Sequence, residues 1–131
     1  YRIRFPDDGI YWYHPHQRED IQQDLGLFGN IRVLPSDSGS VNPVHREVAL
    51  MLDDLLVGED GPVPHGREAP THALMGRFGN IFLTNGSPDW KLQVARGEVV
   101  RFLLTNVASA RIFNVSQGGE TWHPPGGDRI R

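Results

Sequence analysis

Glycine and proline recur along this chain at turn-like positions and cut it into short segments. There are 15 Gly and 10 Pro among the 131 residues, and they do not form a repeat. The runs between them are short and rich in aliphatic and aromatic residues. Such runs, bounded by turn residues, are typical of sandwiches and barrels. The sequence therefore predicts an all-β sandwich or barrel of about eight short strands, with one helical turn or a loop at 17–25 as the only exception.

The expected strands fall into two groups separated by a linker. The run PSDSGSVNPV at 35–44 offers little to bury and has the composition of a linker. We therefore place a first unit at 1–35, a linker at 36–45 and a second unit at 46–131. A Gly- and Pro-rich loop is expected at 58–79 and a tight turn at Asn85-Gly86. The strands are expected at 1–5, 10–16, 30–34, 48–57, 81–84, 90–94, 99–105 and 111–115.

Charge and composition exclude several classes of function. The formal net charge is −3, and no run of Lys or Arg is present, so neither nucleic acid nor an anionic membrane is an expected partner. No apolar run approaches the roughly 20 residues that span a bilayer. The chain has no Cys, which excludes a disulfide framework, a thiolate metal site and a Cys nucleophile within it.

The densest group of metal-ligating residues is His14-Pro15-His16, at the end of the apolar and aromatic run GIYWY. In extended backbone alternate side chains leave the same face, so both imidazoles would share a face with Trp12. Imidazoles in this arrangement can bind one metal ion or two ions held close together. They suit copper, zinc, iron and nickel, so ligand type alone does not name the metal. The competing interpretation is an ordinary structural histidine pair.

Other polar residues are weaker candidates. Glu19 and Asp20 could orient an imidazole from behind, although charged residues in such a turn are usually solvated. Asp53-Asp54 could bind a hard cation, but an ion-pair role or a strand irregularity is the preferred interpretation. The remaining histidines are scattered, and the tryptophans are expected to pack rather than to bind substrate: His45, His65, His72 and His123, and Trp12, Trp90 and Trp122.

The run FPDDGIYWYHPH at 5–16 resembles the second copper motif of the multicopper oxidases, laccase-like enzymes built from cupredoxin domains. The run GLFGNIRV at 26–33 is similar to the strand that closes the first domain of those enzymes. Three later segments resemble the opening half of the next domain: 46–54, 71–80 and 97–102. The resemblance implies a cupredoxin-like Greek-key β-sandwich, present here as two incomplete domains.

The same resemblance implies a cofactor and a reaction. His14 and His16 would each bind one of the two type-3 coppers of a trinuclear cluster. In the family that cluster reduces dioxygen to water with electrons that a type-1 copper takes from a phenol, an amine or a metal ion. Glu19 and Asp20 would lie behind the ligands. The resemblance also favours an extracytoplasmic location.

The remaining copper motifs of the family are missing from this sequence, including the Cys of the type-1 site. We therefore expect an internal fragment that is inactive alone and depends on the remaining oxidase domains or on other copies of the chain. One alternative is a cupin-like module in which His14, His16 and Glu19 share one iron, manganese or zinc ion. The first cupin motif matches at Gly9, His14, His16, Glu19 and Gly26, but two of the spacings between these residues are one residue short. The other alternative is a non-catalytic β-sandwich interaction domain.

Overall fold

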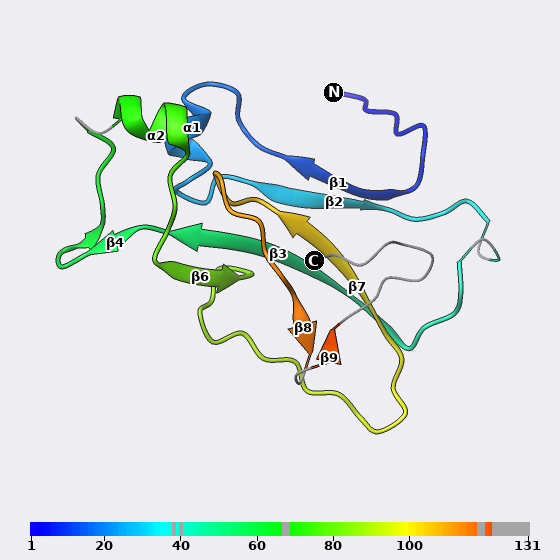
Figure 1. Ribbon diagram of the computed structural model, residues 1–131. Coiled ribbons are helices and arrows are strands. Elements are labelled where there is room, and N and C mark those ends of the chain that lie inside the picture. The colour runs from blue at the N-terminus through cyan, green and yellow to red at the C-terminus, as the bar shows by residue number, and fades with distance from the viewer. Residues whose placement is uncertain (38, 40, 67–68, 118–119, 122–131) are drawn as a thin grey trace.

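The computed structural model describes residues 1–37, 39, 41–66, 69–117 and 120–121, and strands dominate it (Figure 1). This confirms a β-sheet protein with few helices. Within the described residues no helix has the length and apolar character needed to cross a bilayer. The elements are β1 (Gly9–Tyr13), α1 (Glu19–Gln22), β2 (Gly29–Val33), β3 (Arg46–Leu55), β4 (Val57–Gly58), β5 (Gly61–Pro62), α2 (Ala69–Met75), β6 (Ile81–Thr84), β7 (Val100–Asn106), β8 (Ser116–Gln117) and β9 (Glu120–Thr121).

β1 and β2 form a two-stranded antiparallel ribbon, with Gly9 opposite Val33 and Tyr13 opposite Gly29. The connection between them, residues 14–28, begins with the histidine pair and contains α1. The Tyr11 hydroxyl donates to the carbonyl of Asp7 at 2.8 Å and ties the strand to the turn before it. The histidines therefore lie just beyond the end of β1.

The largest sheet has the order β6-β3-β7, with β3 in the centre. β3 and β7 are parallel from Arg46 opposite Val100 to Leu52 opposite Asn106, whereas β6 is antiparallel to β3. The predicted turn after β6 is confirmed, because Asn85 and Gly86 both have positive φ angles of 50° and 76°. Positive φ at both central positions is the geometry that favours Asn-Gly in tight hairpins.

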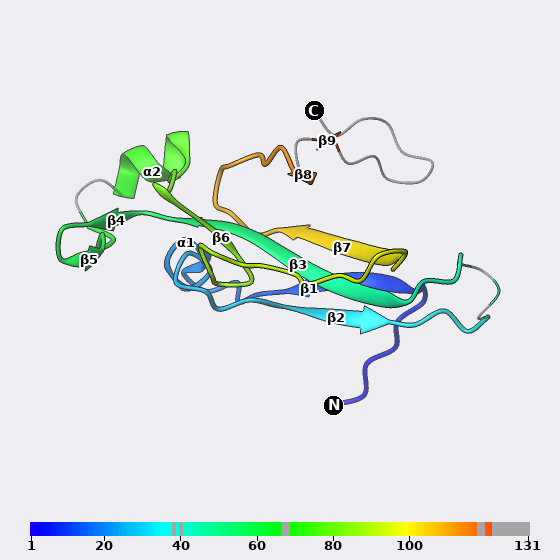
Figure 2. The ribbon, with the colours of Figure 1, turned by 90° about the horizontal axis from the view of Figure 1, so that it is seen from below.

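The two faces of the β3–β7 pair have different partners because side chains alternate along a strand. One face contacts the β1–β2 ribbon through polar groups. Arg32 Nε lies 3.2 Å from Glu47 Oε2, and Asn30 Nδ2 donates to Thr105 Oγ1 at 3.0 Å. Figure 2 shows the ribbon on this side of β3 and β7, with β8 on the other side. The expected first and second units are thus in direct contact.

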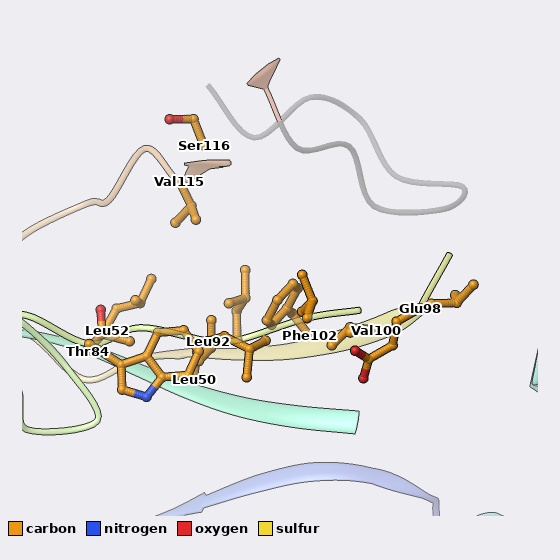
Figure 3. Close-up of a pocket in the computed structure, with 13 residues that line it drawn as sticks. Leu50, Leu52, Thr84, Leu92, Glu98, Val100, Phe102, Val115 and Ser116 are labelled. Carbon is orange, nitrogen blue, oxygen red and sulfur yellow. The ribbon is translucent and has the colours of Figure 1, made fainter. Parts of the chain in front are cut away.

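The opposite face of β3 and β7 lines a half-open apolar slot of about 610 Å³. Its floor consists of alternate residues of both strands, and Val115 lies across the gap from them (Figure 3). Leu50 is 7% exposed at this face, whereas Val107, at the end of β7, is 2% exposed. The floor residues are Leu50, Leu52, Val100, Phe102 and Leu104.

Five sequence predictions of local structure were wrong. Residues 1–5, 90–94 and 111–115 lie outside the assigned strands, and the strand expected at 10–16 ends at Tyr13. Their side chains alternate like those of strands, but a strand also needs a neighbour to pair with. The loop expected at 58–79 contains α2, which begins near Pro70 and ends before Gly76 at a φ of 80°. Proline near the start and glycine past the end were the overlooked helix signal.

Asp54 forms the main buried ion pair of the sheet. Its side chain is 1% exposed and lies 2.7 Å from Nε of Arg111. It also accepts a hydrogen bond from the Gly79 amide at 2.6 Å, while Nη2 of Arg111 donates to the Gly79 carbonyl at 2.8 Å. The Arg111 guanidinium lies over the ring of Phe82 at 4.7 Å. The preferred ion-pair role for this part of the Asp53-Asp54 pair is confirmed.

We expect Asp54→Asn to lower the free energy of unfolding by about 2 kcal/mol or more, because Arg111 would lose its counter-charge in a largely buried setting. Urea unfolding followed by circular dichroism measures the change. Asp89→Asn, at an exposed turn position, is the matched control and should change stability by less than about 0.5 kcal/mol. Equal effects of the two substitutions would contradict this account of the sheet.

Candidate metal site

Just beyond the end of β1, the imidazole of His14 stacks on the indole of Trp12. The two rings lie 3.8 Å apart between centroids and 23° from parallel. Trp12 and His14 are two residues apart, so the parity of the strand continues through His14 although the assigned strand ends at Tyr13. Nδ1 of His14 is shielded from solvent and has no hydrogen-bond partner among the described residues. The stack limits the orientations that this imidazole can adopt.

His16 lies beside His14 and is much more accessible. The centroids of the two rings are 4.7 Å apart, and the His16 side chain is 81% exposed. Its Nδ1 lies 3.4 Å from Oε2 of Glu19, the first residue of α1. One donor atom from each of His14, His16 and Glu19 lies within 4.8 Å of the others. The structure therefore brings together both predicted ligands and one of the two carboxylates expected behind them.

Asp20 has a different partner. Both oxygens of its carboxylate accept hydrogen bonds from Arg18, each at 3.0 Å. These hydrogen bonds hold the pKa of Asp20 below its ordinary range. Arg18 itself has a positive φ of 49° at the start of α1. The Asp20 carboxylate is thus paired with Arg18, whereas the Glu19 carboxylate lies next to His16.

A buried carboxylate group lies behind α1. Asp24 is 5% exposed, and its Oδ2 lies 3.2 Å from His65 Nε2 and 3.3 Å from Arg77 Nε. Loss of water raises the pKa of Asp24, and the neighbouring Arg77 and His65 oppose that rise. Asp24 also lines a small cavity with Glu19 and Asp20. The connection that carries the histidines is therefore anchored in the second unit.

Asp53 is a strongly perturbed acid on β3. Burial, together with the nearby charges of Asp54 and Asp24, raises its pKa from 3.8 to about 6, although a hydrogen bond from the Asp54 amide opposes the shift. Asp53 lies on β3, away from the histidines in the sequence, and no cation faces it among its described partners. The hard-cation hypothesis for Asp53-Asp54 gains no support, since Arg111 already neutralises Asp54.

The other histidines and tryptophans have structural surroundings where the structure describes them. Nδ1 of His45 accepts a hydrogen bond from the Val99 amide at 2.9 Å and fixes the start of β3 beside β7. His65 pairs with Asp24, and His72 lies in α2. Trp90 lines the apolar slot, in agreement with a packing role. Trp122 and His123 lie outside the described residues.

Sequence reasoning missed the group formed by Asp24, His65 and Arg77. Asp24 follows a polar helical turn, where an acid is usually solvated, and its partners lie about 40 and 50 residues further along the chain. No local pattern connects residues at such separations. The candidate metal ligands, by contrast, are close in sequence and were recognisable from their spacing.

The chain matches no protein-family model, no curated protein and no solved structure.

We expect Asp53→Asn to stabilise the protein by about 1–2 kcal/mol at pH 7.5 and to have almost no effect near pH 4. A carboxyl whose folded pKa is raised binds its proton more tightly in the folded state. Stability therefore falls as pH rises from the ordinary value of 3.8 to about 6. The Asn side chain does not ionise, so this loss of stability disappears. Its carbonyl oxygen can still accept the hydrogen bond from the backbone amide of Asp54. Urea unfolding at the two pH values measures the gain, and a gain of equal size at both would contradict the account.

Proposed function

We propose that this chain is a copper-binding piece of a multicopper oxidase, in which His14 and His16 are ligands of the type-3 copper pair. The observation that carries the proposal is the convergence of the two imidazoles beyond the end of β1, with ring centroids 4.7 Å apart. Imidazole nitrogens are ligands that copper prefers. The resemblance of residues 5–16 to the family's copper motif supplies the choice of metal.

The surroundings of the pair fit a bound copper ion. His14 is partly buried, and its Nδ1 is shielded and has no hydrogen-bond partner in the part of the chain that the structure describes. This state usually costs free energy unless a ligand or a proton donor satisfies the nitrogen. His16 is open to solvent, so an ion could reach it. Glu19 lies where a carboxylate orients a ligating imidazole through the ring nitrogen nearest to it.

When complete, the copper cluster supplies the four-electron reduction of dioxygen to water. In this proposal the residues of this chain hold and orient part of that cluster. Trp12 fixes the plane of His14 by stacking, and Glu19 restrains His16. Because the chain has no Cys, the thiolate of a type-1 site would come from residues outside this sequence. Oxidation of a phenol, an amine or a metal ion would then be an activity of the assembled enzyme.

The arrangement of strands supports the finer fold proposal of two incomplete cupredoxin-like units. β1 and β2 would close the first Greek-key sandwich, and β3, β6 and β7 would open the second. The boundary proposed between them, at 36–45, lies between β2 and β3. The apolar slot on β3 and β7 corresponds to a sandwich face that a second layer only partly covers.

A second candidate function is a cupin-like module with one iron, manganese or zinc ion. The gathering of His14, His16 and Glu19 within 4.8 Å favours it, since two histidines and a carboxylate form a common single-ion site. The spacing errors weigh against it, because a shift of one residue moves a strand side chain to the other face. The role of Glu19 separates the two candidates.

We expect specific copper uptake by the wild-type chain and its loss in His14→Ala/His16→Ala. Native mass spectrometry with copper titration measures uptake and oligomeric state together, and His72→Gln is the control for loss of a histidine elsewhere. Glu19→Gln keeps an acceptor oxygen beside His16 and should retain copper under the oxidase proposal. It should abolish binding of a single ion in the cupin-like alternative. Equal uptake by the wild-type chain and the double variant would contradict both candidates.

A further inference from the structure

We propose that Asp24 is a positioning residue for the histidine pair, acting through a clamp formed by Asp24, His65 and Arg77. This clamp fastens the connection between β1 and β2 to the second unit. The inference rests on the proposed function, since it concerns how the copper ligands are held. None of the three residues is expected to touch the metal.

The clamp is almost fully shielded from water. Asp24, His65 and Arg77 have side chains that are 5%, 11% and 4% exposed. Arg77 also donates from Nη2 to the carbonyl of Val63, so its guanidinium joins the segment before α2 to the connection. Asp24 Oδ2, His65 Nε2 and Arg77 Nε lie within ion-pair distance but make no aligned hydrogen bond among the described residues, so their attraction is electrostatic. Removal of Asp24 would leave the Arg77 charge uncompensated in a poorly solvated place.

Backbone hydrogen bonds link the clamp to the metal-site residues. The amide of Leu27 donates to Gln22 at 2.9 Å, and those of Gln22 and Gln23 donate to Arg18 and Glu19 at 2.9 and 3.0 Å. The segment from Arg18 to Leu27 therefore behaves as one compact piece with Asp24 inside it. Displacement of Asp24 would move α1 and with it Glu19.

Glu19 is the residue of α1 that contacts a proposed ligand, His16. Its Oε2 lies 3.4 Å from His16 Nδ1, and both side chains are more than half exposed. An exposed contact of this kind has little strength of its own. The clamp holds α1 in place, so the Glu19 carboxylate is already close to the His16 imidazole. Little further conformational entropy is then lost when the two groups meet. Affinity for a metal ion at His14 and His16 should therefore depend on residues of the second unit.

The test compares two buried ion pairs of the same protein. Copper affinity is measured by competition with a chelator of known strength, and is corrected for the folded fraction found by circular dichroism. Asp24→Asn should weaken copper binding about threefold to fivefold, because the effect reaches the ligands through the exposed contact between Glu19 and His16. Asp54→Asn breaks the pair with Arg111, whose other side-chain contacts among the described residues are with Gly79, Phe78 and Phe82 and not with the connection. The charge of Asp54 also raises the pKa of Asp24, so its removal should not disturb the clamp and should leave the affinity within about 1.5-fold of wild type.

Further variants keep the proposal testable if Asp24→Asn does not fold. His65→Gln removes only one arm of the clamp and should weaken copper binding about twofold to threefold, less than Asp24→Asn does. The electron paramagnetic resonance spectrum of bound copper should change in His65→Gln and Asp24→Asn but not in Asp54→Asn, which a merely structural role would not produce.

Unchanged affinity and spectrum in the clamp variants, beside a wild-type chain that binds copper, would overturn this inference and leave the proposed function standing. Equal losses in Asp24→Asn and Asp54→Asn would also overturn it, because they would mean general destabilisation. Absence of copper uptake by the wild-type chain would contradict the proposed function and the clamp together.

Discussion

The parallel pairing of β3 with β7 is the constraint on which the rest of the structure depends. It joins residues more than 50 positions apart over the full length from Arg46 to Leu52 on β3. Parallel strands need a long crossover, and the crossover here contains β4, β5, α2 and β6. The pairing of β3 with β7 also divides the side chains of these strands between two faces of the sheet. One face receives the β1–β2 ribbon, and the other faces the apolar slot.

Ion pairs and hydrogen bonds connect the first face to the β1–β2 ribbon. Glu47 lies between Arg32 of β2 and Arg101 of β7, and hydrogen bonds from both guanidinium groups hold its pKa below the ordinary range. Partly exposed ion pairs contribute modestly to the free energy of unfolding. Here they fix the position of the β1–β2 ribbon against β3 and β7. The buried clamp at the far end of the ribbon adds the second fixed point. Together they set where the connection with the histidine pair lies.

Sequence reasoning found what local spacing determines. The histidine pair, the neighbouring Glu19, the Asn85-Gly86 turn and the cores of β1, β2, β3, β6 and β7 all follow from residues close together in the chain. Residues 90–94 and 111–115 alternate like strands but lie outside the assigned ladders, because pairing depends on partners that no local pattern specifies. The Asp24, His65 and Arg77 clamp was out of reach for the same reason.

The most direct test of the central claim is which histidines a copper ion approaches. Imidazole resonances of the ¹⁵N-labelled protein can be followed by nuclear magnetic resonance while substoichiometric Cu²⁺ is added. The account predicts that the signals of His14 and His16 broaden together, before those of His45, His65 and His72. Broadening that begins at another histidine, or that affects all of them alike, would contradict a copper site at the end of β1.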